Sequence, residues 1–457
     1  MDTSSWKNIG LQYRDEILNI EVPEWCDILT LKEQPALINA GDQIKKALLN
    51  PIGGRKISDI IASQKKHPSR LSVAITVSDN TRPVPYNGEK EDGILLPLLK
   101  LLEKAGISDS NIYIIIGTGT HVPTSDQWKE AAFGAGITDR YRIMDHDCNS
   151  PDLCFLSEID GIPVRVNRQF MKSDIRITTG LVEPHFMAGV SGGRKAVCPG
   201  LINVEATNVF HGPGFVGNPN ADSLILEKNP CHEFSLKVAL KARVDFNVNV
   251  TLNREMSLSG VFAGDLEGSH REAFEMIRDS SLIQVDHEYD IVLTHGGGVA
   301  INHYQSAKAA CGAVPVLKNG GTVILAAHNS DAEPVGKENY KKLLKLYVEK
   351  ERGKFTDLIS SVGWQFVPDQ WEIQKWEQFF RKAGSFDNLI YCTTGIKPEI
   401  LRNLPCKSGY DLTVTGDITE MVQHAVAYAV DRTERVTGRS TMAFVKEGPY
   451  AVPVLKT

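Results

Sequence analysis

Seven short runs of apolar, mostly β-branched residues recur along the chain, and most of them are followed by a turn and a helical pattern. These runs span residues 71–77, 112–116, 175–179, 246–252, 289–294, 322–326 and 389–392. Most are apolar almost without interruption, which is typical of parallel strands that helices cover on both faces. The run 246–252 instead alternates apolar and polar residues, and this pattern predicts an edge or half-exposed strand.

Apolar residues at three- and four-residue spacing predict helices between these strands. The predicted helices span residues 93–105, 268–278, 340–352, 371–382 and 419–432. Because strands and helices alternate, we expect the α/β class, with two α/β domains, largely parallel sheets and a ligand cleft between the domains. A new strand–turn–helix pattern begins near residue 289, so we expect a first domain over residues 1–284 and a second over 285–430. The tail, 431–457, is expected to pack back on the first domain.

Composition excludes several functional classes. The chain has 457 residues, 42% of them hydrophobic, and a formal net charge of −6. It therefore lacks the basic excess of nucleic-acid-binding proteins, and no apolar stretch approaches the roughly 18 residues that span a bilayer. The first residues lack the apolar core of a secretory signal, and the eight cysteines form no CxxC pair. We expect a cytoplasmic protein with no nucleic-acid and no membrane partner.

Two charged residues follow the first of the apolar strands. Asp79 and Arg82 lie at the carboxyl end of run 71–77, where α/β folds place ligand sites. Arg82 is suited to bind a carboxylate or phosphate through two hydrogen bonds, with Asp79 orienting it or a hydroxyl group. A polar turn that the following proline ends is the alternative.

A histidine follows the next strand behind two glycines. The segment 117–121 begins like a dinucleotide-binding fingerprint, but Val122 stands where the third glycine belongs. A neutral imidazole at His121 can act as a general base, and a structural histidine that caps the loop is an equal alternative.

The segment 180–200 holds the densest set of candidate residues. Ser191, Gly192 and Gly193 are expected to leave backbone N–H groups open to a phosphate, and Arg194 and Lys195 add positive charge. The segment is no Walker A loop, because its spacing differs and an alanine follows the lysine. A flexible glycine turn with a solvated basic pair is the alternative.

A serine hydrolase motif overlaps the same segment. Residues 189–193 match G-x-S-x-G around Ser191, and residues 295–298 match the HGGG sequence of oxyanion loops. Two facts count against this function. The residues before Ser191 do not form the pattern of a buried strand, and an oxyanion loop should precede the nucleophile, whereas HGGG follows it.

The remaining candidates lie further along the chain. His211 lies among glycines and prolines, and spacing alone favours a structural loop histidine over a metal ligand. Tyr304 and Lys308 share one face of a predicted helix with Gln305, which indicates either a ligand site or an amphipathic surface helix. Trp371 provides either an aromatic wall or core packing. Segment 145–148 resembles a metal site, but a capping loop is the favoured interpretation.

Together these residues resemble the nickel-dependent lactate racemase family, over about residues 70–380. The resemblance is carried by residues 79–83, 117–121, 184–195, 211 and 304–308. The spacing of His185, Lys195 and His211 is its most specific part.

The resemblance implies a cofactor and a role for each candidate residue. The family's cofactor is a nickel-pincer nucleotide, the nickel complex of pyridinium-3,5-bisthiocarboxylate mononucleotide. Lys195 matches the lysine that carries this cofactor covalently, His211 matches the nickel ligand, and His121 and His185 match the acid/base pair. The other residues expected to bind the cofactor are Asp79, Ser191, Gly192, Gly193 and Arg194, and those expected to bind substrate are Arg82, Tyr304, Gln305, Lys308 and Trp371. The pincer fills three nickel positions, so one protein ligand is enough.

The resemblance implies a racemase or epimerase that inverts C2 of a 2-hydroxy acid by reversible hydride transfer. Lactate and a larger or sugar-derived hydroxy acid are both compatible with the sequence. The expected partners are that small molecule and the proteins that make the cofactor, and no oligomeric state is predicted. The alternatives are a serine hydrolase that uses Ser191 and a non-catalytic homologue that only binds the cofactor.

Overall fold

The computed structural model describes residues 5–350 and 354–456. The chain forms two compact units. The N-terminal unit comprises residues 33–211 and 218–280. The C-terminal unit comprises the described residues up to Lys32, residues 212–217 and the described residues from Ser281 onward.

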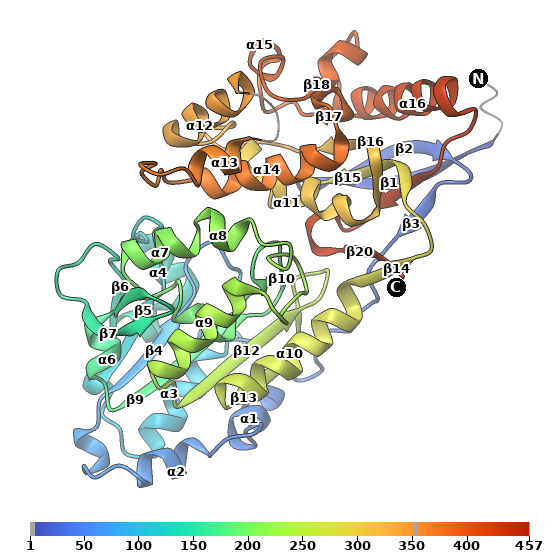
Figure 1. The fold of residues 1–457 in the computed structure, drawn as a ribbon. Coiled ribbons are helices and arrows are strands. Elements are labelled where there is room, and N and C mark those ends of the chain that lie inside the picture. The colour runs from blue at the N-terminus through green and yellow to red at the C-terminus, as the bar shows by residue number, and fades with distance from the viewer. Residues whose placement is uncertain (1–4, 351–353, 457) are drawn as a thin grey trace. The chain divides into compact units, whose positions relative to one another are not determined.

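A six-stranded sheet forms the centre of the N-terminal unit (Figure 1). Its strands, in spatial order, are β13 (Leu258–Gly264), β12 (Phe246–Leu252), β9 (Ile175–Leu181), β4 (Val73–Val77), β5 (Ile112–Ile116) and β6 (Arg142–Asp145). All neighbouring pairs are parallel except β12 with β13. The predicted α/β class with a largely parallel sheet is therefore confirmed for this unit.

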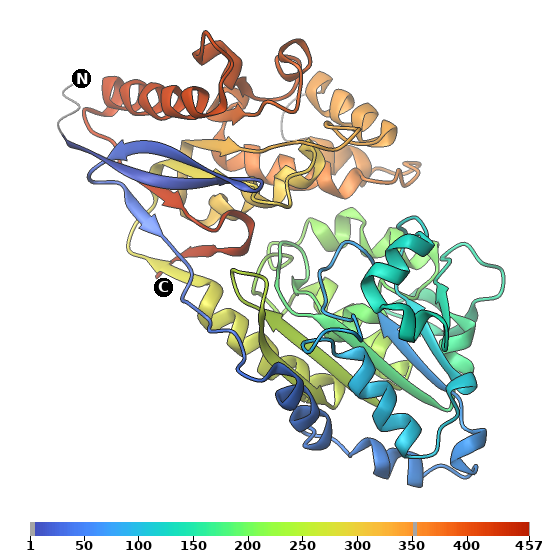
Figure 2. The same cartoon turned by 180° about the vertical axis from the view of Figure 1, so that it is seen from behind.

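Helices cover both faces of this sheet (Figures 1 and 2). The helices of the unit are α1 (Ala40–Leu49), α2 (Ile57–Ala62), α3 (Leu95–Lys104), α4 (Asp126–Phe133), α5 (Ala135–Thr138), α6 (Arg168–Lys172), α7 (Val204–Phe210), α9 (Pro230–Lys241) and α10 (Leu266–Ser281). Leucines of α3 pack with Ile75, Ile114 and Ile177 in one apolar core. On the other face, Arg176 donates to main-chain carbonyl groups in α6 and just after α9. Two short hairpins, β7 (Cys154–Ile159) with β8 (Ile162–Val166) and β10 (Pro184–His185) with β11 (Gly189–Val190), complete the unit.

Strand β12 is an internal strand, so the prediction of an edge or half-exposed strand is wrong. It pairs with β9 on one side and β13 on the other, and its polar residues are fully buried. Asn247 accepts a hydrogen bond from Thr178 and donates one to Ser269 of α10. Asn249 accepts one from the main chain of Gly193. The alternating pattern therefore reflects a buried polar face rather than a solvated one.

The C-terminal unit contains a six-stranded, fully parallel sheet. Its strands, in spatial order, are β18 (Lys407–Ser408), β17 (Leu389–Cys392), β16 (Leu317–Ala326), β15 (Tyr289–His295), β19 (Met442–Val445) and β3 (Asp27–Leu29). An antiparallel hairpin of β1 (Trp6–Tyr13) and β2 (Glu16–Pro23) and a parallel pair of β14 (Leu282–Val285) and β20 (Val452–Leu455) accompany it.

Strand β15 shows why its sequence is continuously apolar. Val292 faces one core, with residues of α11, α12 and α14. Ile291 and Leu293 face a second core, with residues of α16 and of the β1–β2 hairpin. The helices of the unit are α8 (Pro213–Val216), α11 (His303–Ala313), α12 (Glu338–Glu349), α13 (Phe355–Ile359), α14 (Gln370–Ala383), α15 (Pro398–Leu401) and α16 (Ile418–Thr437). All five predicted helices are present with ends shifted by a few residues, and residues 351–352 of the third lie outside the described residues.

The division of the chain differs from the expected boundaries. Strands β1 to β3 belong to the C-terminal unit, because β3 pairs with β19 at the edge of its sheet. The tail also belongs to this unit, where β20 pairs with β14 and β19 pairs with β15. Strand pairing between the two ends of the chain has no local sequence signal. Among residues 5–350 and 354–456, no helix combines the length and apolar character that crossing a bilayer requires.

Candidate active site

Asp79 and His121 meet at the carboxyl ends of β4 and β5. The Nδ1 atom of His121 lies 2.6 Å from Oδ2 of Asp79, and the other carboxylate oxygen accepts hydrogen bonds from the main chain and hydroxyl of Thr81. Burial raises the pKa of Asp79, but the hydrogen bonds from His121 and Thr81 outweigh it, and the net pKa is lowered. The carboxylate is therefore ionised and can only accept hydrogen bonds.

This contact sets the tautomer of His121. An ionised acceptor beside Nδ1 requires the proton on Nδ1, which leaves Nε2 as a proton acceptor. The His121 side chain is 56% exposed, whereas that of Asp79 is 5% exposed. The ring is therefore held at one end by a buried carboxylate while most of its surface stays available to a substrate.

Arg82 is held by a residue that the sequence did not indicate. Its Nε lies 2.9 Å from Oε1 of Glu183, and its Nη1 donates to the carbonyl of Thr81. Both members of the ion pair are largely buried. The pair links the loop after β4 to the loop after β9. Glu183 directly precedes β10, so this ion pair connects Arg82 to the hairpin of β10 and β11.

His185 lies at the turn of that hairpin and is half-buried. Its Nδ1 accepts a hydrogen bond from the main-chain N–H of Ala188 at 3.3 Å. A neutral imidazole that accepts at Nδ1 carries its proton on Nε2. In their neutral forms, His185 is therefore a proton donor at the nitrogen where His121 is a proton acceptor.

The glycine loop after β11 packs tightly on the sheet, which contradicts the predicted cradle of open N–H groups. The N–H of Ser191 donates to the carbonyl of Glu183, and that of Gly193 donates to Asn249. Gly192 has a φ of 72°, and a Cβ there would lie 2.9 Å from Oδ1 of Asn249. The glycines therefore allow close packing, and two of the three predicted phosphate donors are already used.

Ser191 has the environment of a structural residue and not that of a nucleophile. Its hydroxyl donates to the carbonyl of Leu181 and accepts from the main chain of Glu183, and the side chain is buried. His270 contacts the Ser191 carbonyl and not the hydroxyl. The HGGG histidine, His295, donates to the carbonyl of Lys446 and accepts from the N–H of Gly297. These contacts argue against the serine hydrolase alternative.

Arg194 is buried beneath this loop. Its guanidinium contacts the carbonyls of Ala188 and Ser191 and the ring of His270. Its predicted contact with the cofactor stays a prediction.

Lys195 lies in the short 3-10 helix Gly193–Ala196. Its Nζ lies 5.6 Å from the centre of the Phe210 ring. Burial, followed by the charges of Arg194 and Arg82, lowers the pKa of Lys195 to about 7. A large fraction of this side chain is therefore the neutral, nucleophilic amine near neutral pH.

His211 follows α7 directly, and its N–H donates to the carbonyl of Thr207. Its ring meets the ring of Phe210 edge to face, with centres 5.1 Å apart. Burial, followed by the charges of Lys195 and His121, lowers the pKa of His211 to about 3. The imidazole is therefore neutral, which is the form that binds a metal ion.

The N-terminal unit contains the four residues to which the resemblance assigns catalytic, metal-binding and cofactor-tethering roles, and the charges of Lys195 and His121 act on His211. In the described parts of the chain, no three His, Cys, Asp or Glu side chains form a metal-binding group. A site with a single protein ligand, as the resemblance implies, is compatible with that arrangement. The segment 145–148 is structural, since His146 is buried against the carbonyl of Ile202.

Apart from Arg82, the predicted substrate-binding residues lie in α11 and α14 of the C-terminal unit. The rings of Tyr304 in α11 and Trp371 in α14 meet edge to face at 5.8 Å. Asn302 caps α11 by accepting from the N–H of Gln305. Lys308 lies close enough to lower the pKa of buried Glu372, which burial raises well above its usual value. Glu372 carries no site signal in the sequence.

The sequence also did not indicate two residues that position others in the N-terminal unit. Glu183 pairs with Arg82 about a hundred residues away, and Asn249 holds Gly193. Asn249 had a partial signal, because a strand with regularly spaced Asn residues is unusual.

Comparisons with known proteins identify relatives that match most of this chain. Residues 13–223 match the lactate racemase N-terminal domain, and residues 285–434 match the lactate racemase C-terminal domain. The lactate racemase of Thermoanaerobacterium thermosaccharolyticum is 31% identical over 376 residues, which cover 80% of this chain and 84% of that protein. The lactate racemase of Lactiplantibacillus plantarum is 29% identical over 371 residues, 79% of this chain and 82% of that protein.

Solved structures show the same relationship. The lactate racemase apoprotein of T. thermosaccharolyticum aligns with a TM-score of 0.84 at 27% identity, covering 99% of this chain and all of that one. A protein of Thermotoga maritima, at 17% identity and a TM-score of 0.64, shares the fold over 93% of this chain and all of its own. The two matched domains together span most of the sequence, and the chain belongs to the lactate racemase family.

Proposed function

We propose that this protein inverts C2 of a 2-hydroxy acid, with His121 and His185 as the acid/base pair. One observation carries the proposal. The charges of Lys195 and His121 both act on the buried ring of His211, so a tethering amine, a metal-binding imidazole and a supported base lie in one neighbourhood.

The residues fit a nickel-pincer nucleotide. Lys195 offers a buried amine whose lowered pKa favours acylation, so it would hold the cofactor through an amide-type bond. His211 offers a neutral imidazole for the nickel position that the pincer leaves open. When bound, the cofactor supplies the group that takes the hydride from C2 and returns it.

The two histidines handle the proton. Nε2 of His121, left unprotonated by the contact of Nδ1 with Asp79, accepts the proton of the C2 hydroxyl as the carbon is oxidised to a ketone. Nε2 of His185 carries the proton that the oxygen of the opposite enantiomer needs. Each histidine serves one enantiomer, and the roles exchange in the reverse direction.

Charged side chains orient the substrate. Glu183 binds Nε of Arg82, and the Nη2 group of Arg82 donates its hydrogen bonds to the substrate carboxylate in this proposal. Lys308, Gln305, Tyr304 and Trp371 provide further substrate contacts in this proposal. Lactate is the substrate that the names of the relatives indicate, and a larger hydroxy acid is the alternative.

The test combines a mass measurement with an activity measurement. The full chain is produced together with proteins that make the cofactor, and its intact mass is determined. We expect an adduct on Lys195 and exchange of the D- and L-forms of at least one acid in a panel of 2-hydroxy acids.

Two variants sharpen this test. Lys195→Ala should lose both adduct and activity, whereas Lys237→Ala, which removes an exposed lysine paired with Asp160, should keep both. An adduct without exchange at C2 of any acid would establish the non-catalytic alternative. Full activity of Lys195→Ala would refute the proposal.

A further inference from the structure

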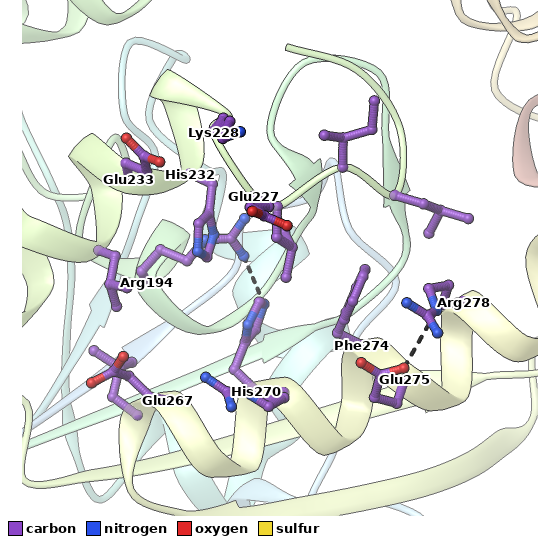
Figure 3. A pocket seen from close by; sticks show the side chains of 16 residues that line it. Arg194, Glu227, Lys228, His232, Glu233, Glu267, His270, Phe274, Glu275 and Arg278 are labelled. Carbon is purple, nitrogen blue, oxygen red and sulfur yellow. Dashed lines mark hydrogen bonds and ion pairs between the residues drawn. The ribbon is translucent and has the colours of Figure 1, made fainter. Parts of the chain in front are cut away.

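A pocket of about 870 Å³ lies between α9 and α10 in the N-terminal unit (Figure 3). Its walls include Leu224, Leu226, Leu266 and Phe274, and Arg194, His232 and His270 are among its polar lining residues. None of the residues assigned above to proton transfer, nickel binding or covalent attachment lines it. Arg194, which the resemblance assigns to the cofactor, does line it, so the pocket is distinct from the residues proposed to move the proton, bind nickel and carry the covalent bond.

Among the residues that the structure describes, the buried cation of Arg194 has no counter-charge. Its side chain is 1% exposed, and its described partners are two carbonyl oxygens and one imidazole nitrogen. Within the described residues, Nε has no hydrogen-bond partner, and no carboxylate is among the charges that act on the pKa of the group. Burial lowers the pKa of Arg194 to about 9, so the guanidinium still carries its charge at neutral pH. Buried charges in proteins are normally paired.

The two histidines beside Arg194 are neutral and do not compensate its positive charge. His270 lies 2.6 Å from Nη1 of Arg194, and because arginine only donates, the imidazole nitrogen accepts. Figure 3 shows His232 beside the guanidinium. Its Nδ1 is buried without a hydrogen-bond partner, and burial, followed by the charge of Arg194, lowers its pKa to about 3. Both rings are therefore neutral.

The rim does not balance Arg194 either. It carries Glu227, Glu233, Glu267 and Glu275 together with Lys228, Arg271 and Arg278. Glu275 is paired with Arg278. Glu227 and Lys228 lie in the loop before α9 (Figure 3), and the groups whose charges act on the pKa of Arg194 are Cys231 and Cys198, with no rim carboxylate among them. The pocket therefore has apolar walls and, at its base, a cation whose Nε is free to donate a hydrogen bond. A ligand with an apolar tail and a negatively charged head group would complement both features.

We propose that this pocket binds a small amphipathic carboxylate, whose head pairs with Arg194 and whose apolar tail lies against Leu266 and Phe274. The planar edge of an arginine at Nε and one Nη matches the two oxygens of a carboxylate. His232 lines the path to this edge, and its unpartnered Nδ1 can donate a third hydrogen bond to the head group. The proposed binding does not depend on the racemase function.

The experiment measures binding of ω-trifluorohexanoate to the full chain without cofactor by fluorine NMR at pH 7.5. The matching alcohol, ω-trifluorohexanol, has the same tail without the charge. We expect the acid to bind at least roughly tenfold more tightly than the alcohol, a ratio that corresponds to about 1.4 kcal/mol.

Variants locate the binding. Arg194→Lys keeps the positive charge but loses the planar edge, and Phe274→Ala removes part of the apolar wall. Each should weaken binding of the acid several-fold, and circular dichroism checks that each is folded. Arg82→Ala, which removes the carboxylate-binding side chain of the proposed active site, should leave this binding unchanged.

Three results would overturn the proposal. One is the absence of saturable binding of the acid to the wild-type chain, and another is equal binding of acid and alcohol. The third is binding that Arg82→Ala abolishes while folded Phe274→Ala and Arg194→Lys retain it, since the acid would then occupy the active site.

Discussion

The Nδ1 atom of His121 lies 2.6 Å from Oδ2 of Asp79, and the buried carboxylate is fixed by Thr81 through its other oxygen. Two hydrogen bonds from Thr81 fix one oxygen of the carboxylate, and the other oxygen orients the imidazole of His121. Asp79 is a positioning residue in this arrangement, and its effect on catalysis passes through His121.

Asp79→Asn tests that relationship. The amide can donate to Nδ1 and so stabilise the tautomer whose proton is on Nε2, which removes the base. We expect kcat to fall on the order of 10⁴-fold with a smaller change in KM, as for other bases that lose an orienting carboxylate. The measurement is the rate of interconversion from each enantiomer with holoenzyme.

Asp145→Asn is the matched control. Asp145 also lies at the end of a strand and accepts from Thr124, but it pairs with Lys129 instead of a histidine. Its variant should keep kcat. Equal kcat in Asp79→Asn and wild type would remove Asp79 from the mechanism.

Glu183 should control how Arg82 meets the substrate. Glu183→Ala leaves Arg82 without its partner at Nε, so we expect KM to rise about tenfold, equivalent to about 1.4 kcal/mol. Glu183→Gln keeps an acceptor while removing the charge, so its KM should stay within about threefold of wild type. If both variants raise KM equally, the charge of Glu183 matters rather than its geometry.

Ser191→Ala should lower stability without abolishing catalysis. The variant leaves the buried carbonyl of Leu181 and N–H of Glu183 without their hydroxyl partner. We expect a loss of about 1–3 kcal/mol in the free energy of unfolding, measured by urea denaturation. A fluorophosphonate probe should not label the wild-type protein, and labelling at Ser191 would restore the hydrolase alternative.

Lys195 should make the stability of the apoprotein depend on pH. The fold lowers its pKa from 10.5 to about 7, so between these values the unfolded chain binds more protons than the folded one. Stability therefore rises with pH across this window, by at most about 1.4 kcal/mol per pH unit from this group. Lys195→Met lacks this contribution.

The comparison uses urea denaturation of both apoproteins at several pH values from 7 to 10. The stability advantage of Lys195→Met over wild type should shrink as the pH rises. An advantage that is independent of pH would show that Lys195 is charged in the folded protein.

Local patterns were sufficient for the strands and helices whose burial is uniform. The run 289–294 is apolar throughout because alternate residues enter two different cores, and a strand buried on both faces requires such a run. The run 246–252 was wrongly predicted to be an edge or half-exposed strand, because hydropathy does not distinguish a polar side chain in water from one that is hydrogen-bonded inside the protein. Asn247 and Asn249 have buried partners that lie in distant parts of the chain.

The site shows the same limit. Asp79, His121 and Lys195 follow strands and glycines, so their positions carry a signal. Glu183 and Glu372 act through partners that are far apart in sequence, and nothing near them in the chain indicates a role. The pairing of β3 with β19 is a contact between the two ends of the chain and likewise has no local pattern.

His211→Ala separates attachment of the cofactor from binding of the metal. The covalent bond is proposed to form at Lys195, whose buried amine does not depend on the His211 side chain as an acceptor, whereas nickel would lose its protein ligand. We expect the intact mass to show an adduct of the organic part, and metal analysis to show nickel reduced about 10- to 100-fold in affinity or more. His146→Gln is the control, because His146 is a buried histidine of the same unit that holds the carbonyl of Ile202. Nickel bound equally in His211→Ala and His146→Gln would assign the metal ligand to another residue, and loss of the adduct in His211→Ala would show that attachment itself requires this imidazole.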